Sequence, residues 1–578
     1  MRKLEMRVVG FRSLFIVGCA LSFFQAGLAE LGHSQEFLNL PVIKPAISCE
    51  RLAKAALGKV DAEAVSIQSA TQVDTPKGHF CKVKGNIGQV TAFEVDLPIE
   101  HWSQRLVQNA FNASAIANGG TCAPALNGEF AVAFSSPGFA VGQAYASRSK
   151  ELQSRIDSAY RASHLTALTA KALIRNFYGQ PQRFAYFLGC SAGGLQAMNE
   201  VERFPRDFDG VSAGSPLLLN GVHNIFFHSW ESYINKRADG SRILASSRMP
   251  ILHQSVMEHC AQTAGVLDGV LLQPTACKFD PAWLQCLADA ADTAHCLTAE
   301  EVGVVDNLYA GPGDGKGRHF EIAGFAMGSE LRWGLSIADH IANPEARDGG
   351  KMKRLLAPPD SDKSVSELKD ELAFNQEWFE KAIALAPLFN GANTDIRRFQ
   401  QHGGKLILWH GAEDLTVQPE VSVAYYQGVQ KVLGVKETDT FLRLFMIPGF
   451  GHCVGGEIPF QFDVLTPLMA WTELHRAPQK IMAGNPAGGA SESIPYGGVR
   501  TPIAAPDRPN LFTRPVFPFP MMARYTGKGD PNDAANYSPA RSGAPVPQMF
   551  DTEAATLFGP HNQKFYHVAD GQLEPDKK

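Results

Sequence analysis

The segment at residues 183–199, RFAYFLGCSAGGLQAMN, constrains the fold of this chain more than any other stretch. Its apolar run at 184–188 predicts a buried strand, and the GCSAG sequence at 189–193 predicts a sharp turn into a helix beginning near Gly194. In such a G-x-S-x-G turn the glycines let strand and helix approach closely, while the serine hydroxyl stays exposed above the helix N-terminus. Ser191 is therefore the candidate nucleophile. The alternative is a chance G-x-S-x-G, against which the flanking strand and helix argue.

Strands and helices are expected to alternate on both sides of this turn. We expect strands at 90–97 and 130–134 and an amphipathic helix at 162–177. The alternation returns at 405–409 (KLILW) and 441–447 (FLRLFMI). This rhythm predicts an α/β fold with a mostly parallel sheet covered by helices.

The rhythm is interrupted in the middle of the chain. Residues 217–400 carry four cysteines and Gly/Pro-rich connections such as GPGDG at 311–315, which is expected of a large inserted lid domain. The catalytic core would then comprise residues 30–216 and 401–545. Residues 546–578 are expected to form a polar C-terminal tail with little packing.

Residues 1–29 have the pattern of a signal peptide. A positively charged start precedes an apolar run at 14–24 that is too short to span a bilayer, and small residues follow it. The alternative is a lipobox at 16–19, which would make Cys19 a lipidated N-terminus. No other stretch is long and apolar enough to predict a membrane span. We expect secretion or a periplasmic location, and hence an oxidising compartment.

The charge composition limits which kinds of binding partner are expected. The 578 residues include 53 Lys and Arg and 58 Asp and Glu, a formal net charge of -5. This balance gives no basic field for nucleic acid and favours a small neutral or mildly charged substrate. The oligomeric state stays open.

Two predicted strands in the second half of the chain end next to an aspartate and a histidine, the partners that a serine nucleophile needs. HGAED at 410–414 follows the first strand, and PGFGHC at 448–453 follows the second. Functional groups gather at the carboxyl ends of strands in open α/β sheets, and the order Ser191, Asp414, His452 is that of α/β-hydrolases. His452 would take the serine proton, and Asp414 would hold the other imidazole nitrogen.

Neighbouring residues compete for these roles. Glu413 is the alternative to Asp414, which would then be a turn residue. For His452 the alternative is a packed loop histidine. Three further histidines are expected to be structural or exposed: His164, His402 and His410.

Ten cysteines are present, and nine remain without Cys19, so one is left unpaired in an oxidising compartment. The short spacings Cys260/Cys277 and Cys286/Cys296 predict local disulfides. No Cys-x-x-Cys or Cys/His spacing suggests zinc.

The residues around the candidate triad resemble the tannase and feruloyl esterase family. Cys190 directly before the serine and Cys453 directly after the histidine match that family's paired Cys-Ser and His-Cys signature. Together the matching motifs run in order through most of the chain, from about residue 45 to about residue 540: RFPRDFDGVSAG at 203–214, CLT at 296–298, LYAGP at 308–312, HGAED at 410–414, PGFGHC at 448–453 and ARYTGKGDPNDAA at 523–535.

The resemblance implies a secreted serine esterase with an α/β-hydrolase core and an inserted lid. It would act through an acyl-serine intermediate on esters of aromatic acids: galloyl, feruloyl or other hydroxycinnamoyl, or phthalate-like. The alternatives are a terephthalate mono-ester hydrolase-like activity, a serine peptidase, and a non-catalytic phenolic- or carbohydrate-binding protein on the same scaffold.

The resemblance also implies site details. A Cys190–Cys453 disulfide would lock the serine loop to the histidine loop, and Ala192 would supply an oxyanion donor through its backbone N–H. The other donor cannot be placed, because the family's glycine cluster is replaced at 108–120 by QNAFNASAIANGG. The remaining expected pairs, which leave Cys122 free, are Cys49–Cys81, Cys260–Cys277 and Cys286–Cys296.

A calcium loop of the family is altered here. Relatives carry C-D-x-x-D-G-V-x-D-G, whose aspartates bind Ca²⁺, but residues 260–269 read CAQTAGVLDG, with Ala261 and Ala264 at two carboxylate positions. Only Asp268 remains, and with the carbonyls of Val266 and Val270 it falls short of the roughly 6–8 oxygens that Ca²⁺ takes. We therefore expect no metal and no other cofactor, with Asp268 as a turn-capping carboxylate.

Overall fold

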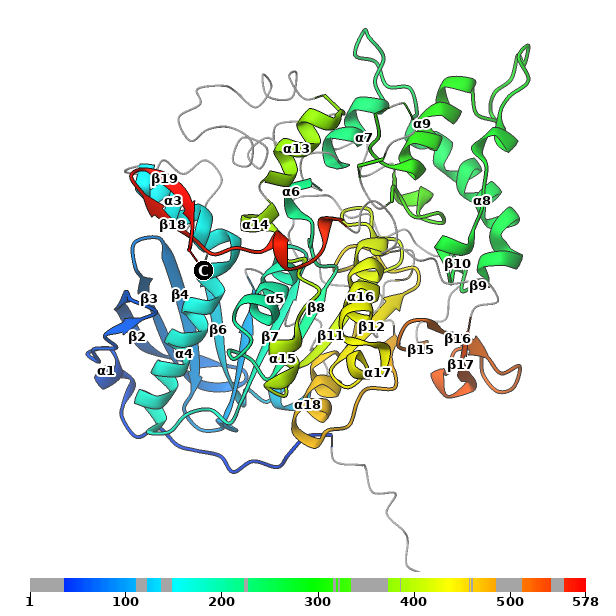
Figure 1. Ribbon diagram of the computed structural model, residues 1–578. Helices are drawn as coiled ribbons and strands as arrows, with labels where there is room; N and C mark the ends of the chain where they lie inside the picture. Colours follow the sequence, from blue (N-terminus) through cyan, green and yellow to red (C-terminus); the bar gives the residue numbers. More distant parts are fainter. Residues whose placement is uncertain are drawn as a thin grey trace, which may run out of the picture. The chain divides into compact units, whose positions relative to one another are not determined.

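A ten-stranded sheet forms the centre of the protein in the computed structural model (Figure 1). The structure describes residues 36–110, 122–136, 148–222, 227–314, 316, 319–320, 323–333, 373–384, 386–456, 458, 461–484, 512–541 and 556–577. The strand order is β1-β2-β3-β4-β6-β5-β7-β8-β11-β12. The strands are β1 (Lys59–Val60), β2 (Glu63–Thr75), β3 (Gly78–Ile87), β4 (Thr91–Pro98), β5 (Arg105–Asn109), β6 (Phe130–Ser136), β7 (Phe184–Cys190), β8 (Gly210–Gly214), β11 (Lys405–Gly411) and β12 (Leu442–Ile447).

The sheet is mixed, which corrects the expectation of a mostly parallel one. The pairings from β6 through β5, β7, β8 and β11 to β12 are parallel. Those from β1 through β2, β3 and β4 to β6 are antiparallel. The α/β class is confirmed, with β1 to β3 as an addition that the sequence pattern missed. In β2 polar residues interrupt the apolar ones, and nearly all its side chains are at least partly exposed.

The central strands are buried on both faces, as expected of parallel strands covered by helices. Leu106, Phe187 and Leu408 face one apolar cluster, whereas their neighbours Val107 and Tyr186 face another. On the first face, nearest the viewer in Figure 1, lie α4 (Ala162–Tyr178), α5 (Ala192–Arg203) and α16 (Pro419–Leu433). On the second face lies α18 (Leu465–Leu474). The helix expected at 162–177 is therefore present.

Smaller elements complete the description. Among the described residues, the other α-helices of four residues or more are α1 (Cys49–Leu52), α2 (Ala123–Leu126), α3 (Arg148–Ile156), α7 (His228–Ile234), α8 (Met249–Ala264), α9 (Ala299–Ala310), α13 (Gln376–Ala384), α14 (Ala386–Phe389), α15 (Arg397–Gln401) and α17 (Val435–Thr438). The small sheets are built from β9 (Val266–Leu267) with β10 (Val270–Leu271), β13 (Gln461–Phe462) with β14 (Ile481–Gly484) and β15 (Thr513–Val516), and β16 (Met521–Tyr525) with β17 (Tyr537–Arg541).

The region assigned to a lid has an apolar cluster of its own. Leu252 and Val256 of α8 pack there with Val305 and Leu308 of α9. Helix α9 begins with a capping box in which Thr298 and Glu301 satisfy each other's backbone N–H groups. Nevertheless, Glu36–Lys578 form one compact unit, so a separate lid domain over 217–400 stays a prediction.

The C-terminal residues differ from the expected unpacked tail. The hairpin of β18 (Tyr566–Ala569) and β19 (Gln572–Pro575) lies beside α3 (Figure 1). Leu557 and Phe558 are buried. Arg203 at the end of α5 donates to the Lys564 carbonyl. These contacts were hidden from sequence analysis because they join segments more than 350 residues apart.

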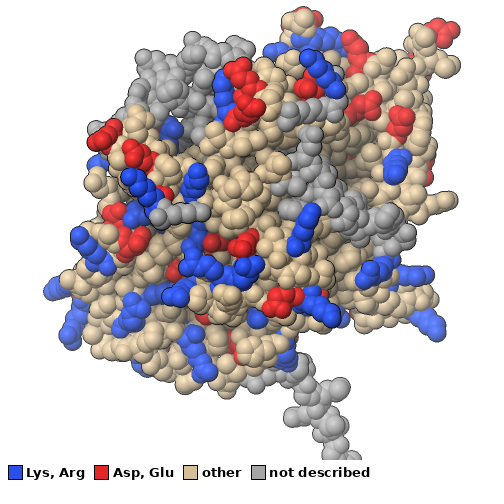
Figure 2. Space-filling model, in the orientation of Figure 1, with Lys and Arg blue, Asp and Glu red and all other residues tan. Residues whose placement is uncertain are grey.

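Charge is distributed evenly over the surface in view. Figure 2 shows Lys and Arg side chains interspersed with Asp and Glu on the described part of that face. Within the described ranges, no helix is long and apolar enough to cross a membrane. The predicted signal peptide and Cys19 lie outside the described residues.

Candidate active site

The predicted nucleophile turn joins β7 to α5. Ser191 lies between them with φ 63° and ψ -124°, a backbone conformation that is costly for a residue with a side chain. The surroundings enforce it, because its N–H donates to the Gly214 carbonyl at 2.9 Å. A Cβ atom on Gly189 would lie 2.1 Å from the Gly193 carbonyl oxygen. Glycine is therefore required where the G-x-S-x-G pattern places it.

The residue after Ser191 offers a backbone donor. Ala192 is the first residue of α5 and is exposed. N–H groups in the first turn of a helix have no intrahelical acceptor, and the helix dipole makes this end attractive to negative charge. The Ser191 side chain makes no capping hydrogen bond to the helix. Of the stretch at 108–120, only residues 108–110 are described, so the other oxyanion donor stays unplaced.

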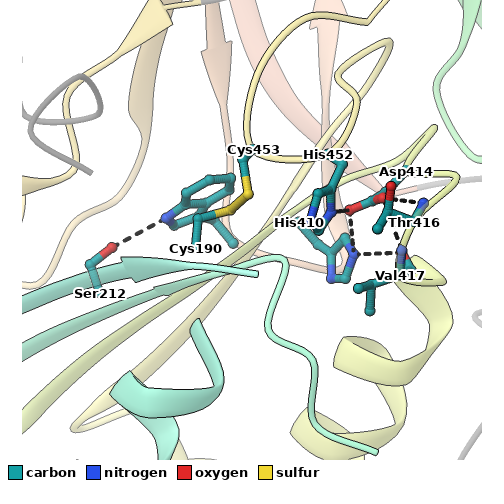
Figure 3. The surroundings of a disulfide bond; sticks show 9 residues. Cys190, Ser212, His410, Asp414, Thr416, Val417, His452 and Cys453 are labelled. Carbon is teal, nitrogen blue, oxygen red and sulfur yellow. Dashed lines mark hydrogen bonds and ion pairs between the residues drawn. A yellow bond between two sulfur atoms is a disulfide. The ribbon is translucent and has the colours of Figure 1, made fainter. Parts of the chain in front are cut away.

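Asp414 and His452 meet at the ends of neighbouring parallel strands. His452 Nδ1 donates to Asp414 Oδ2 at 2.7 Å (Figure 3). Asp414 is fully buried, and its Oδ1 accepts from the backbone N–H groups of Thr416 and Val417 at 2.8 and 3.0 Å. Burial would raise the pKa of Asp414, but the charge of His452 and the hydrogen bonds from both histidines hold it well below its usual value. Asp414 is therefore an ionised acceptor.

This geometry fixes the proton on His452. Because Nδ1 donates to Asp414, the neutral ring presents Nε2 as an acceptor. No hydrogen bond joins Ser191 Oγ to His452 within the described structure. Such bonds are often long in enzymes without substrate and tighten on binding.

A disulfide links the two loops directly. Cys190 precedes Ser191 and Cys453 follows His452, and their Cα atoms are 5.9 Å apart (Figure 3). The other expected pairs are also formed: Cys49–Cys81, Cys260–Cys277 and Cys286–Cys296. Cys122 is the unpaired one, and burial raises its pKa to about 12, which keeps the thiol protonated.

The competing residues occupy other positions. The Glu413 N–H donates to the Phe450 carbonyl, and the Glu413 carbonyl accepts from Arg332 Nη1 at 3.0 Å. His402 is exposed and accepts from Arg206 Nε at 2.9 Å. His402 is thus the exposed kind among the histidines that were expected to be structural or exposed.

His410 lies much closer to the site than its sequence suggested. It is fully buried, and its Nε2 lies 3.2 Å from Asp414 Oδ2. A histidine four residues before the aspartate, at the end of the same strand, was the available signal.

Comparisons with known proteins agree with this geometry. The profile of the family described as tannase and feruloyl esterase matches residues 77–540. The chain belongs to this family. Mono(2-hydroxyethyl) terephthalate hydrolase from Piscinibacter sakaiensis is 29% identical over 436 residues, which cover 67% of this chain and 68% of that protein. A probable feruloyl esterase B-1 from Neosartorya fischeri is 29% identical over 398 residues, covering 65% and 70%.

The fold is shared as well. The crystal structure of feruloyl esterase B from Aspergillus oryzae matches with a TM-score of 0.67 at 23% identity, over 85% of this chain and 100% of that one. The family resemblance expected from the cysteines beside the triad is thus confirmed, and this member of the tannase and feruloyl esterase family is a carboxylic ester hydrolase.

The family's calcium loop does not fit the ion in this member. Asp268 and Gly269, both with positive φ, form the tight turn of the β9–β10 hairpin. Arg514 binds both Asp268 oxygens, with Nε and Nη2 each at 2.6 Å. The guanidinium of Arg514 already occupies both carboxylate oxygens that a calcium ion would need as ligands. Ala261 and Ala264 offer no side-chain oxygen to replace them. Calcium independence stays a prediction.

A cluster of one histidine and two carboxyl groups lies on the sheet face that α4 and α5 cover. One ligand-type atom from each of His164, Glu200 and Asp207 lies within 4.8 Å of the others. His164 Nδ1 bonds to the Asp207 carboxylate, and Lys171 Nζ donates to its carbonyl. Burial and the charge of Asp207 raise the pKa of Glu200 well above its usual value, against the opposing charge of Lys171. The raised pKa favours the neutral form of Glu200, which reduces the repulsion between the two carboxyl groups.

Loss of the Cys190–Cys453 bridge should weaken both stability and activity. We expect the double variant Cys190→Ala/Cys453→Ala to lose about 5 kcal/mol of unfolding free energy, because the bond closes 263 residues. We expect kcat/KM to fall by about 10²-fold as the two loops drift. Denaturant unfolding and ester kinetics measure these effects. As control, Cys286→Ala/Cys296→Ala opens only a 10-residue separation and should leave kcat intact. Equal activity losses in both variants would contradict this role.

Chelation should leave the wild-type protein unchanged, since Arg514 already compensates Asp268. We expect no change in Tm or activity with EDTA, and a loss of about 3 kcal/mol in Arg514→Met, which strands a largely buried carboxylate. The double variant Arg514→Met/Asp268→Asn should recover part of that loss. A rise of several degrees in the wild-type Tm on adding calcium would refute calcium independence.

Glu200→Gln should flatten the pH dependence of stability. The folded-state pKa of Glu200 is raised, so the folded protein keeps a proton that the unfolded chain releases above its ordinary pKa of 4.5. Wild-type stability therefore falls as the pH rises from there, whereas Gln stays neutral. We expect similar unfolding free energies near pH 5 and a more stable variant near pH 9. Destabilisation at every pH would instead mean that the charged carboxylate is needed.

Proposed function

We propose that this protein hydrolyses carboxylic esters of aromatic acids through an acyl-serine intermediate, with Ser191, His452 and Asp414 as the catalytic triad. The observation that supports this best is the 2.7 Å hydrogen bond from His452 to a buried, ionised Asp414, one residue away from the disulfide that leads to Ser191.

The steps follow from the placement of the protons. His452 Nε2 takes the Ser191 hydroxyl proton as Oγ attacks the ester carbonyl, and Asp414 stabilises the imidazolium that forms. The Ala192 N–H stabilises the oxyanion. Collapse of the tetrahedral intermediate releases the alcohol with the proton from His452. Water, deprotonated by the same histidine, then hydrolyses the acyl-serine and frees the acid.

The aromatic acyl group is proposed from the relatives. They include a terephthalate mono-ester hydrolase and a probable feruloyl esterase, whose acids share a benzene ring. We place the acid-side pocket between the triad and residues 217–400. Leu415, directly after Asp414, belongs to the same apolar cluster as α8 and α9, so that region does reach the site.

Export is part of the proposal. Four disulfides among the described residues and the signal-like sequence at 1–29 both support a secreted or periplasmic enzyme.

Replacement of the triad residues should remove activity without unfolding the protein. We expect Ser191→Ala to lower kcat by about 10⁴-fold or more, and Asp414→Asn to be nearly as damaging because it favours the wrong imidazole tautomer. Glu413→Gln is the matched control and should keep most activity. Circular dichroism checks folding. Near wild-type turnover by Ser191→Ala would refute the serine mechanism.

A substrate panel then separates the alternatives. Methyl gallate, methyl ferulate, a chlorogenic acid ester, the terephthalate mono-ester and short p-nitrophenyl esters test the acyl class. Matched amides test for a peptidase. Binding of phenolic esters with no turnover of any of them would favour a binding protein.

A further inference from the structure

We infer that His410 is a positioning residue that holds the carboxylate of Asp414 through its Nε2–H and moderates the basicity of His452. This inference rests on the proposed triad. It concerns a residue that touches neither substrate nor the reacting atoms, and acts through Asp414.

The surroundings of His410 are closed and polar. It lies near the end of β11 with no exposed surface. Its Nε2 faces two oxygens, the Val417 carbonyl at 3.0 Å and Asp414 Oδ2 at 3.2 Å (Figure 3). Its Nδ1 lies 2.8 Å from Ser422 Oγ. Ser422 belongs to α16, so the ring links the sheet, the aspartate loop and the covering helix.

These contacts assign the ring's protons. A carbonyl and an ionised carboxylate can only accept, so Nε2 must carry a proton. In the neutral ring Nδ1 then accepts from the Ser422 hydroxyl. His410 is thereby oriented as a donor to the catalytic aspartate.

The result is a carboxylate with all its acceptor directions engaged. Oδ1 accepts from the N–H groups of Thr416 and Val417, and Oδ2 accepts from His452. The Nε2–H of His410, which the Val417 carbonyl shares, lies 3.2 Å from Oδ2 as the fourth donor. Four donors fix the plane of the carboxylate, which fixes the orientation of the His452 ring. Each donor also withdraws charge from Asp414, so the His410 bond weakens the hold of Asp414 on protonated His452.

Few other charges face His410. Besides Asp414 and His452, the carboxyl group that interacts with it is Glu420 in the first turn of α16. Burial raises the pKa of Glu420, so that group tends toward its neutral form. Asp414 is therefore the charged partner that His410 contacts directly.

A pair of near-isosteric variants tests the inference. His410→Gln can place an amide N–H near the Nε2 position, whereas the shorter His410→Asn can place one only near Nδ1. The assay is the pH profile of kcat and kcat/KM on a p-nitrophenyl ester in the full chain, beside unfolding free energies. We expect His410→Asn to lower kcat by about 10-fold or more with KM little changed, and to move the acidic limb upward by about half a pH unit. His410→Gln should restore most of both.

Two controls separate this role from a merely structural one. Ser422→Ala removes the link to α16 but keeps the Nε2 donor, so it should cost stability without moving the acidic limb. In an Asp414→Asn background, His410→Asn should have little further effect on kcat.

An unmoved acidic limb in His410→Asn, or an undiminished effect of His410→Asn in the Asp414→Asn background, would overturn the inference. So would equal losses in the Gln and Asn variants, including failure of both to fold. The proposed triad is judged separately by Ser191→Ala, whose loss of activity does not depend on His410.

Discussion

The parallel ladder of β7, β8, β11 and β12 is the constraint on which the site depends. Cys190 pairs with Gly214, Gly214 with Trp409, and Gly411 with Ile447, so the strands end at nearly one level. Each functional loop leaves the sheet at that edge. The register also depends on Gly214, where a Cβ atom would lie 2.0 Å from the Trp409 ring, and the indole N–H reaches Ser212 on the same neighbouring strand at 3.2 Å.

A buried charge network stabilises β7 and its neighbour β5 away from that edge. Glu473 of α18 accepts from Arg105 Nε and Nη2 at 2.8 and 2.7 Å, and from the Tyr186 hydroxyl at 2.7 Å. Arg105 begins β5 and Tyr186 lies in β7, so one carboxylate ties the helix to both strands. A bidentate pair with its remaining acceptor positions engaged is the form in which buried charge is tolerated. The strand that leads to the proposed nucleophile is thus held at both ends.

Local sequence patterns predicted the segments of the candidate active site. They could not predict contacts between residues far apart in the chain. Ser191, Asp414 and His452 each follow an apolar strand, so the sequence period and the positions of the strand ends marked them as candidates. The antiparallel strand β2 was missed because polar residues break its apolar pattern. The ion pair between Asp268 and Arg514 joins residues 246 apart, and no local signal marks it. His410 was placed among structural residues because a pattern shows which residues end a strand, but not which way a ring nitrogen points.

The order of the cysteines along the chain bears on how this protein matures. During synthesis Cys49 and Cys81 emerge as neighbours and can pair at once, as can each of the two short-range pairs. Cys190 must instead wait for Cys453, and meanwhile the nearest available thiol is Cys122. Premature bonding between those two would prevent the nucleophile loop from reaching its partner. Burial of Cys122 beside Met469 protects it only after α18 is made. Any chain in which Cys190 bonds to Cys122 first must exchange that disulfide late in folding, so a disulfide isomerase is a natural aid to producing this enzyme.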